Sequence, residues 1–260
     1  MLPFPTIGFV GTGTISAAMA RGLLADPPAL EAVLVSPRNA ETAARLAADF
    51  SAVTIAADNQ SVIDGSAVVV LAVRPQIAEG VIRPLRFREG QTVISLVAAT
   101  ERETLHAWIG AGVTLVQAVP LPFVERRRGT TALYPPDATA QALFDVLGTA
   151  VACDTPAEYD LLAAASALMA SYFGIMDRTV RWLEKEGLPA KKGRAYLAPL
   201  FAELGETARL SGAESFDHLS REFATKGGLN EQVFSDFEKN GGTAALTAAL
   251  DRVLARIRGR

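Results

Sequence analysis

Short apolar runs alternate with amphipathic helical patterns along the first 155 residues of this 260-residue chain. Helical spacing is clearest after the first run, where Ile15, Met19 and Leu23 share one face. The run at 67–73 is almost unbroken and β-branched, which is typical of a central parallel strand covered on both faces. This alternation predicts a doubly wound α/β domain over residues 1–155. Strands are predicted at residues 6–10, 32–35, 51–55, 67–73, 92–97 and 113–119, with a further short strand at 132–134.

The pattern changes near Pro156, after which helical spacing replaces the apolar runs. We therefore predict an all-α domain over residues 156–260. Its first helix is closed by Gly187-Leu188-Pro189, and its apolar stripe can serve as a seam for another helix, in this chain or in a partner. The stripe consists of Leu161, Ala165, Leu168, Tyr172, Ile175, Thr179 and Leu183. Further helices are predicted at about 192–212, 216–223, 230–239 and 243–257.

Composition narrows the class of protein. Half of the residues are apolar and a fifth are charged, which suits a buried core and argues against disorder. The net charge of -3, with no basic block, makes nucleic acid an unexpected partner. The single cysteine, Cys153, excludes an internal disulfide and fits a reducing cytoplasm. No secretory signal is evident, and a cytoplasmic location is expected.

Two further features argue against membrane and metal binding. The longest apolar segment, 161–176, is shorter than the roughly 20 residues that span a bilayer, so we expect a buried helix and no membrane partner. The only histidines, His106 and His218, lie on predicted surface helices without a metal-ligand spacing, and no metal is expected.

A glycine-rich turn follows the first predicted strand. Gly11 suits a tight turn, and Gly13 would let the backbone approach a phosphate at the start of the next helix. This G-x-G spacing is typical of dinucleotide-binding folds, although Ser16 stands where a third glycine is usual. The motif is weak by itself, and the alternating fold around it is its main support.

The end of the second predicted strand bears on the choice of cofactor. NAD sites usually carry an acidic residue there, whereas this chain has Ser36-Pro37-Arg38 and no carboxylate before Glu41. Ser36 can donate to a 2′-phosphate, and Arg38 can pair with it or lie against the adenine. The turn favours NADP over NAD as the cofactor.

Three segments resemble pyrroline-5-carboxylate reductases: IGFVGTGTISAAMARGLL at 7–24, VVLAVRPQ at 69–76 and VISLVAATERET at 93–104. The helical half is similar in layout, including Gly187-Leu188-Pro189 and Thr225-Lys226-Gly227-Gly228. The resemblance implies a Rossmann domain followed by a helical dimerisation domain, with the active site between the subunits of a homodimer. It also implies an enzyme that reduces the cyclic imine of pyrroline-5-carboxylate to proline with NAD(P)H.

The resemblance also implies roles for individual residues. Arg74 stands where the family usually has lysine, which keeps the positive charge. Asn59 could instead cap a helix, and Pro75 could simply end a strand. The implied cofactor residues are Gly11, Thr12, Gly13, Thr14 and Ile15 along the pyrophosphate, Ser36 and Arg38 at the 2′-phosphate, Asn59 near the ribose beside the nicotinamide, and Ala72, Val73, Arg74, Pro75 and Ala98 along the groove.

The substrate half departs from the family pattern. The usual Arg-x-Met-Pro-Asn reads Gln117-Ala118-Val119-Pro120-Leu121, and Ser-Pro-Gly-Gly-Thr-Thr reads Thr225-Lys226-Gly227-Gly228-Leu229-Asn230. The implied substrate residues are Pro120, Lys226, Gly227, Gly228 and Asn230. No catalytic residue is assigned, and Tyr172 and Lys226 are the candidate proton donors.

Three functions stay open at this point. The first is direct hydride transfer from NADPH to pyrroline-5-carboxylate, which yields L-proline. The second is NADP-dependent reduction of a different imine or keto substrate, because lost polar contacts can shift selectivity strongly. The third is NADP binding without catalytic turnover.

Overall fold

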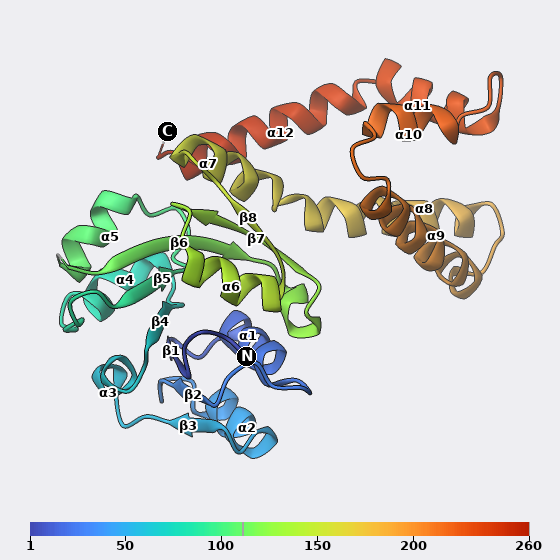
Figure 1. Cartoon of the computed structure of the whole chain (residues 1–260). Coiled ribbons are helices and arrows are strands. Elements are labelled where there is room, and N and C mark those ends of the chain that lie inside the picture. Colours follow the sequence, from blue (N-terminus) through green and yellow to red (C-terminus); the bar gives the residue numbers. More distant parts are fainter. Residues whose placement is uncertain (111, 260) are drawn as a thin grey trace. The chain divides into compact units, whose positions relative to one another are not determined.

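The computed structural model describes residues 1–110 and 112–259 and divides the chain into two compact units (Figure 1). The first unit holds residues 1–164 together with the chain from Leu254 onward, and the second holds residues 165–253. The sequence-based division after residue 155 differs, because most of α7 (Pro156–Ala165) belongs with the first unit. Each unit is described separately below.

The first unit is built on an eight-stranded sheet of order β3-β2-β1-β4-β5-β6-β7-β8. All neighbouring strands are parallel except β6 and β7, which pair antiparallel. The predicted doubly wound, mainly parallel sheet is confirmed, and β8 is an addition that the sequence reading missed. The strands are β1 (Thr6–Val10), β2 (Ala32–Val35), β3 (Val53–Ile55), β4 (Val68–Leu71), β5 (Thr92–Ser95), β6 (Thr114–Pro120), β7 (Gly129–Tyr134) and β8 (Gly148–Ala152).

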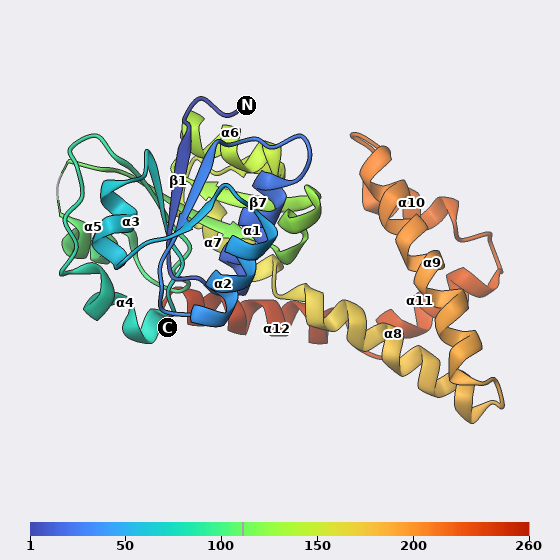
Figure 2. The same cartoon turned by 90° about the horizontal axis from the view of Figure 1, so that it is seen from below.

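Helices cover both faces of this sheet. Figure 2 shows α3, α4 and α5 on one side of the strands and α1, α2 and α6 on the other. The helices of this unit are α1 (Thr14–Leu24), α2 (Ala40–Asp49), α3 (Asn59–Asp64), α4 (Pro75–Ile82), α5 (Arg102–Ile109), the 3-10 turn η1 (Pro122–Arg126), α6 (Ala138–Val146) and α7.

The β-branched run on β4 explains this layering. Successive side chains of a strand point to opposite faces. Val68 and Val70 accordingly lie in the apolar cluster with α1, α2 and α6, whereas Val69 and Leu71 lie in the cluster with α3, α4 and α5. All four are buried. Burying such a side chain contributes about 1.5–3 kcal/mol, so the central strand anchors both layers.

The second unit is helical, as predicted, but has little core of its own. Its helices are α8 (Leu168–Lys185), α9 (Ala190–Leu210), α10 (Phe216–Glu222), α11 (Leu229–Lys239) and most of α12 (Gly242–Ile257). Among the described residues, α8, α11 and α12 contribute no buried side chain. Leu197 of α9 and Leu219 of α10 are the large apolar residues that are buried there.

The expectation of a buried helix at 161–176 is wrong for the single chain. Phe173 is 60% exposed and Ile175 of the apolar stripe is 56% exposed, although Tyr172 of the stripe packs on Phe201 of α9. The helical stretch Pro156–Lys185 is also long and apolar enough to cross a membrane by length and composition, and only 6% of its most apolar window is buried. It is interrupted between α7 and α8, at residues 166–167.

Candidate functional site

The glycine turn lies at the end of β1, between the two halves of the sheet. The strand order reverses beside β1, where β2 lies on one side and β4 on the other. Open α/β sheets bind ligands in the crevice at such a switch point, beyond the carboxyl ends of the strands. Gly11 has φ +100°, and a Cβ there would collide with the backbone carbonyl of Ala72 after β4. Glycine is therefore required for the two strand ends to meet.

Ser16 supports this turn from the position of the missing third glycine. Its buried hydroxyl donates to the carbonyl oxygen of Gly11 at 2.6 Å. Thr12 is also buried, and its hydroxyl donates to the carbonyl oxygen of Ser36 at 2.7 Å. The departure from the usual glycine motif thus adds hydrogen bonds that hold the turn in place.

The N-terminus of α1 is suited to an anion. Gly13 precedes the helix, no side chain caps it, and its first turn holds no acidic residue. A Cβ on Gly13 would meet no atom within 4 Å, so a ligand has room to approach the backbone there. Free N–H groups and the helix dipole favour a phosphate at this end. The turn therefore fits the pyrophosphate of a dinucleotide.

Ser36 and Arg38 have different surroundings. The hydroxyl of Ser36 is fully buried, accepts the N–H of Gly11 at 2.9 Å and lies 3.2 Å from the hydroxyl of Thr12. It therefore ties the end of β2 to the glycine turn. Arg38 is exposed and forms no ion pair with any residue in 1–110 or 112–259. Of the two, Arg38 is better placed to contact a 2′-phosphate.

Three of the predicted groove residues, Asn59, Arg74 and Pro75, lie at the starts of helices. Asp58, rather than Asn59, caps α3, and its carboxylate accepts the N–H of Ser61 at 2.7 Å. The backbone and hydroxyl of Ser61 lower the pKa of Asp58. Asn59 is then free of the capping role and half-buried. Arg74 precedes α4 and is exposed, and Pro75 takes the first helical position, where its missing N–H costs nothing.

A cavity of about 310 Å³ opens beside these elements within the first unit. It brings together Thr14, Ile15 and Ala98 from the predicted cofactor set with Pro120 from the predicted substrate set. The cavity is lined by Thr14, Ile15, Leu96, Ala98, Ala118, Val119, Pro120, Pro122 and Tyr159. Tyr159 is not among the predicted site residues, because no motif marks it and the predicted boundary at residue 155 assigns it to the helical domain.

The remaining predicted substrate residues lie in the second unit. Gly227 has φ +74°, and its N–H donates to the carboxylate of Glu231 at 2.6 Å. The side-chain amide of Asn230 donates to the carbonyl oxygen of Phe223 at 2.8 Å. Gly228 precedes α11, and Lys226 is exposed. Donor groups of two predicted substrate residues, Gly227 and Asn230, are thus already engaged within the second unit.

Tyr172, one of the two candidate proton donors, packs among other aromatic rings. Its ring meets those of Phe173 and Phe201 edge-on, with centroids 5.2 and 5.6 Å away. The tyrosine is 39% exposed in the single chain. These contacts favour packing over proton transfer.

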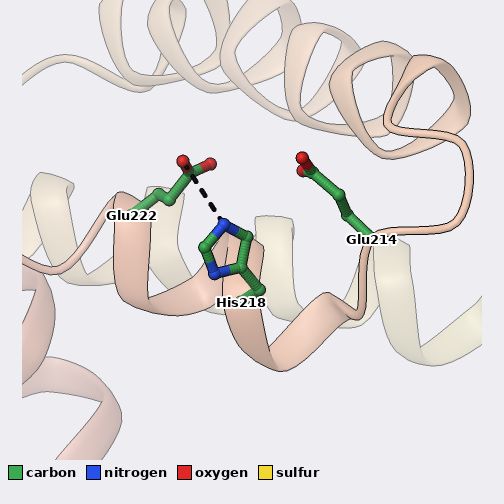
Figure 3. Close-up of side chains that lie close together, drawn as sticks. All are labelled: Glu214, His218 and Glu222. Carbon is green, nitrogen blue, oxygen red and sulfur yellow. Dashed lines mark ion pairs between the residues drawn. The ribbon is translucent and has the colours of Figure 1, made fainter.

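A group of possible metal ligands, which the sequence reading did not anticipate, lies on α10 and the turn before it (Figure 3). Glu214, His218 and Glu222 each offer an atom within 4.8 Å of the others, and all three residues are exposed. Nε2 of His218 lies 3.6 Å from a carboxylate oxygen of Glu222. Exposed groups of this kind often pair with one another, and they are not part of the cavity in the first unit.

Known proteins resemble this chain in sequence and in fold. The family model described as "NADP oxidoreductase coenzyme F420-dependent" matches residues 6–99. A pyrroline-5-carboxylate reductase of Pseudomonas aeruginosa is 26% identical over 97% of this chain and 95% of its own length. A Coxiella burnetii pyrroline-5-carboxylate reductase structure has a TM-score of 0.84 at 22% identity, with 97% of each chain covered. The Plasmodium falciparum pyrroline carboxylate reductase, solved with NADP bound, has a TM-score of 0.81 at 16% identity, covering 100% of this chain and 98% of that one.

The glycine turn, the switch-point crevice and these matches define an NAD(P)-dependent oxidoreductase. Within that class, the chain is similar to pyrroline-5-carboxylate reductases over nearly its whole length. This similarity supports an NAD(P)H-dependent imine reductase.

Proposed function

We propose that this chain reduces pyrroline-5-carboxylate to L-proline with NADPH, by direct hydride transfer to the imine carbon. The observation that carries the proposal is the cavity, which joins the start of α1 and Ala98 to Pro120 at the end of β6. One wall comes from the proposed cofactor site and the other from the proposed substrate site. The relative in Pseudomonas aeruginosa is named for this activity, and its similarity to this chain covers nearly its whole length.

The residues of the first unit have a limited task in this reaction. The backbone from Gly11 to Ile15, at the start of α1, would hold the pyrophosphate. The groove for the ribose and nicotinamide would be lined by Asn59, Ala72, Val73, Arg74, Pro75 and Ala98. The bound cofactor supplies the hydride, and the apolar cavity wall excludes water and aligns the reacting carbon. An iminium carbon is already activated, so neither a metal nor a strong acid is required.

NADPH is proposed over NADH because of the end of β2. An exposed arginine without an ion pair in the described part of the chain stands at the position where a carboxylate would select NAD. A guanidinium binds phosphate with charge-assisted hydrogen bonds. Arg38 would supply this contact, and the buried Ser36 would hold the turn that presents it.

We also propose that the helical unit is a dimerisation domain. Its exposed apolar residues gather on helices that lack a core of their own, which marks an interaction surface. Phe173, Trp182 and Phe234 are each at least 50% exposed. A second copy explains this better than a bilayer does, because α8 carries Asp177, Arg178 and Arg181 in its middle. A cytoplasmic homodimer without membrane or nucleic-acid partners is the proposed state.

A second candidate is the reduction of a different imine or a keto substrate. The observation that favours it is the turn before α11, where Glu231 occupies the N–H of Gly227. A carboxylate already bound there competes with a substrate carboxylate for the same donor and repels it. Lys226 would still offer a contact, but the N–H of Gly228 also donates, to the carbonyl oxygen of Thr225 at 2.7 Å, and these engaged donors weaken the case for an acidic substrate.

The experiment is a substrate panel assayed with NADPH and NADH in parallel. Purified protein is mixed with pyrroline-5-carboxylate, with cyclic imines that lack a carboxylate and with 2-oxo acids, and loss of reduced-cofactor absorbance is followed. We expect the fastest oxidation with NADPH and pyrroline-5-carboxylate. A clear preference for an imine without a carboxylate selects the second candidate. Tight NADPH binding without oxidation across the panel contradicts both candidates and leaves a binding protein without turnover.

A further inference from the structure

The cavity in the first unit contains few groups that can form hydrogen bonds through a side chain. Of its lining residues, Ile15, Leu96, Ala98, Ala118, Val119, Pro120 and Pro122 have apolar side chains. Thr14 and Tyr159 are the two that carry hydroxyls. Thr14 begins α1, at the end that faces the pyrophosphate site. Tyr159 therefore remains as the hydroxyl available to a substrate in this cavity.

Tyr159 comes from α7, and its ring is held by its neighbours. The ring centroid lies 6.5 Å from that of Tyr134 on β7, in a tilted arrangement. The guanidinium of Arg102 lies over the Tyr134 ring, 6.0 Å from its centroid. Within residues 1–110 and 112–259 the Tyr159 hydroxyl forms no hydrogen bond, whereas the hydroxyls of Thr12, Ser16 and Ser36 are all engaged.

We propose that Tyr159 contacts the substrate, with its hydroxyl hydrogen-bonded to the heteroatom of the C=N or C=O bond that receives the hydride. This inference rests on the proposed function and names the polar group that orients its substrate. The phenol holds the reacting bond against the nicotinamide side of the cavity. An iminium carbon accepts hydride directly and gives a neutral amine, so no proton is transferred in that case. With a neutral imine or ketone the phenol donates to the lone pair of the heteroatom, and the anion formed by hydride addition takes that proton, which the phenol regains from water.

The protonation state of the phenol suits this role. Burial raises the pKa of Tyr159, and the neighbouring Cys153 and Asp160 raise it further. The hydroxyl consequently keeps its proton at any pH at which the enzyme would work. It can donate to a neutral imine or ketone, and its oxygen can accept the N–H of an iminium.

The first test is Tyr159→Phe, which removes the hydroxyl and keeps the ring. Tyr134→Phe is the matched control, since this neighbouring ring is not part of the cavity lining. We expect Tyr159→Phe to lower kcat/KM about a hundredfold on the best substrate of the panel. Loss of one hydrogen-bond donor at a reacting atom has an effect of this size in other enzymes. The NADPH Kd and Tm should stay near wild type, and Tyr134→Phe should stay within about threefold in kcat/KM. An equal loss in both variants, or near-wild-type activity of Tyr159→Phe, overturns the proposal.

The second test does not depend on turnover. The chain has four tyrosines, so protein labelled with ¹³C at the tyrosine Cζ carbon gives four resonances, and Tyr159→Phe assigns one of them. We expect the Tyr159 resonance to move when NADP⁺ is added, because the cavity would then hold the nicotinamide. If the panel shows no oxidation, the proposed function fails by itself, and this spectrum still decides whether Tyr159 faces the cofactor. A resonance that does not respond to NADP⁺ overturns the proposal.

Discussion

The two units differ in how they keep apolar side chains from water. In the first unit, helices cover both faces of a sheet, and large residues such as Phe9, Leu71 and Phe144 are fully buried. In the second unit, large residues such as Phe173 and Trp182 are more than half exposed. Both units contain amphipathic helices. Only in the first unit does a sheet cover the apolar faces of these helices.

This difference has a functional counterpart. The first unit already holds the glycine turn, the switch-point crevice and the cavity. In the second unit, the N–H groups of Gly227 and Gly228 and the side-chain amide of Asn230 already donate to nearby residues of that unit. In the proposed dimer, the residues that would bind the cofactor come from the first unit, whereas the substrate half would depend on assembly.

The largest predicted effect contrasts a core residue with a surface residue of the same type. Phe144→Ala removes a fully buried ring from α6 and should lower the free energy of unfolding by about 3–5 kcal/mol. Phe173→Ala should cost less than about 1 kcal/mol at concentrations where the chain is monomeric. Urea unfolding of both variants measures this, and equal losses would break the contrast between the units.

The next prediction concerns assembly. Phe173→Asp places a charge on the exposed apolar face of α8 and should weaken the proposed dimer by about a hundredfold or more, as expected for a buried aromatic anchor. The matched control in the first unit is Ile55→Asp on β3, where Ile55 is 41% exposed. This variant should leave the dimer intact. Sedimentation velocity over a concentration series measures both, and a monomeric wild type at micromolar concentration would contradict the proposal.

Two glycines of one turn should respond differently to the same change. Gly11→Ala forces a Cβ into the Ala72 carbonyl at positive φ and should cost about 1–3 kcal/mol of stability as well as NADPH binding. Gly13→Ala meets open space, so it should keep the wild-type Tm and weaken only NADPH binding. Thermal melts with NADPH titrations separate the two effects. Unchanged NADPH affinity in Gly13→Ala would contradict pyrophosphate binding at this turn.

A smaller effect is expected on cofactor choice. Arg38→Ala should raise the NADPH Kd about tenfold or more, by loss of a charge-assisted contact, and leave the NADH Kd nearly unchanged. Ser36→Ala should instead weaken both cofactors together, because the Ser36 hydroxyl braces Gly11. Parallel titrations with the two cofactors give the answer, and an equal loss for both in Arg38→Ala would disprove the 2′-phosphate contact.

The smallest effect is a pH dependence within the first unit. Burial lowers the pKa of His106, and Arg102 lowers it further, while Glu103 opposes both. The unfolded chain then binds the proton more readily, so this contribution to stability is present above the ordinary pKa of about 6.5 and is lost as the pH falls through the lowered value. His106→Gln should flatten the fall in unfolding free energy on acidification. If the unfolding free energy of His106→Gln falls more steeply on acidification than that of the wild type, the pKa of His106 is not lowered in the folded chain.

Much of the fold could be predicted because local sequence patterns indicate individual helices, strands and turns. The β-branched run on β4, the G-x-G turn and the helical stripe each depend on residues close together in sequence. The antiparallel β7, the added β8 and the return of the chain to the first unit after Leu254 depend on distant pairings that no local pattern encodes.

The site divides along similar lines. Gly11, Gly13 and Arg38 could be recognised because a motif or its departure marked them. Tyr159 reaches the cavity from α7, beyond the predicted boundary, and the internal bonds of Asn230 and Gly227 are visible only in three dimensions. Long-range geometry, rather than residue type, decides these roles.

The central claim is that the cavity brings a hydride donor and an imine carbon together. It is tested most directly with NADPH deuterated at the transferable C4 position, incubated with protein and pyrroline-5-carboxylate. The account predicts L-proline that carries one deuterium at the former imine carbon, detected by mass spectrometry. Product without deuterium, or no product from protein that binds NADPH tightly, would contradict direct hydride transfer in this site.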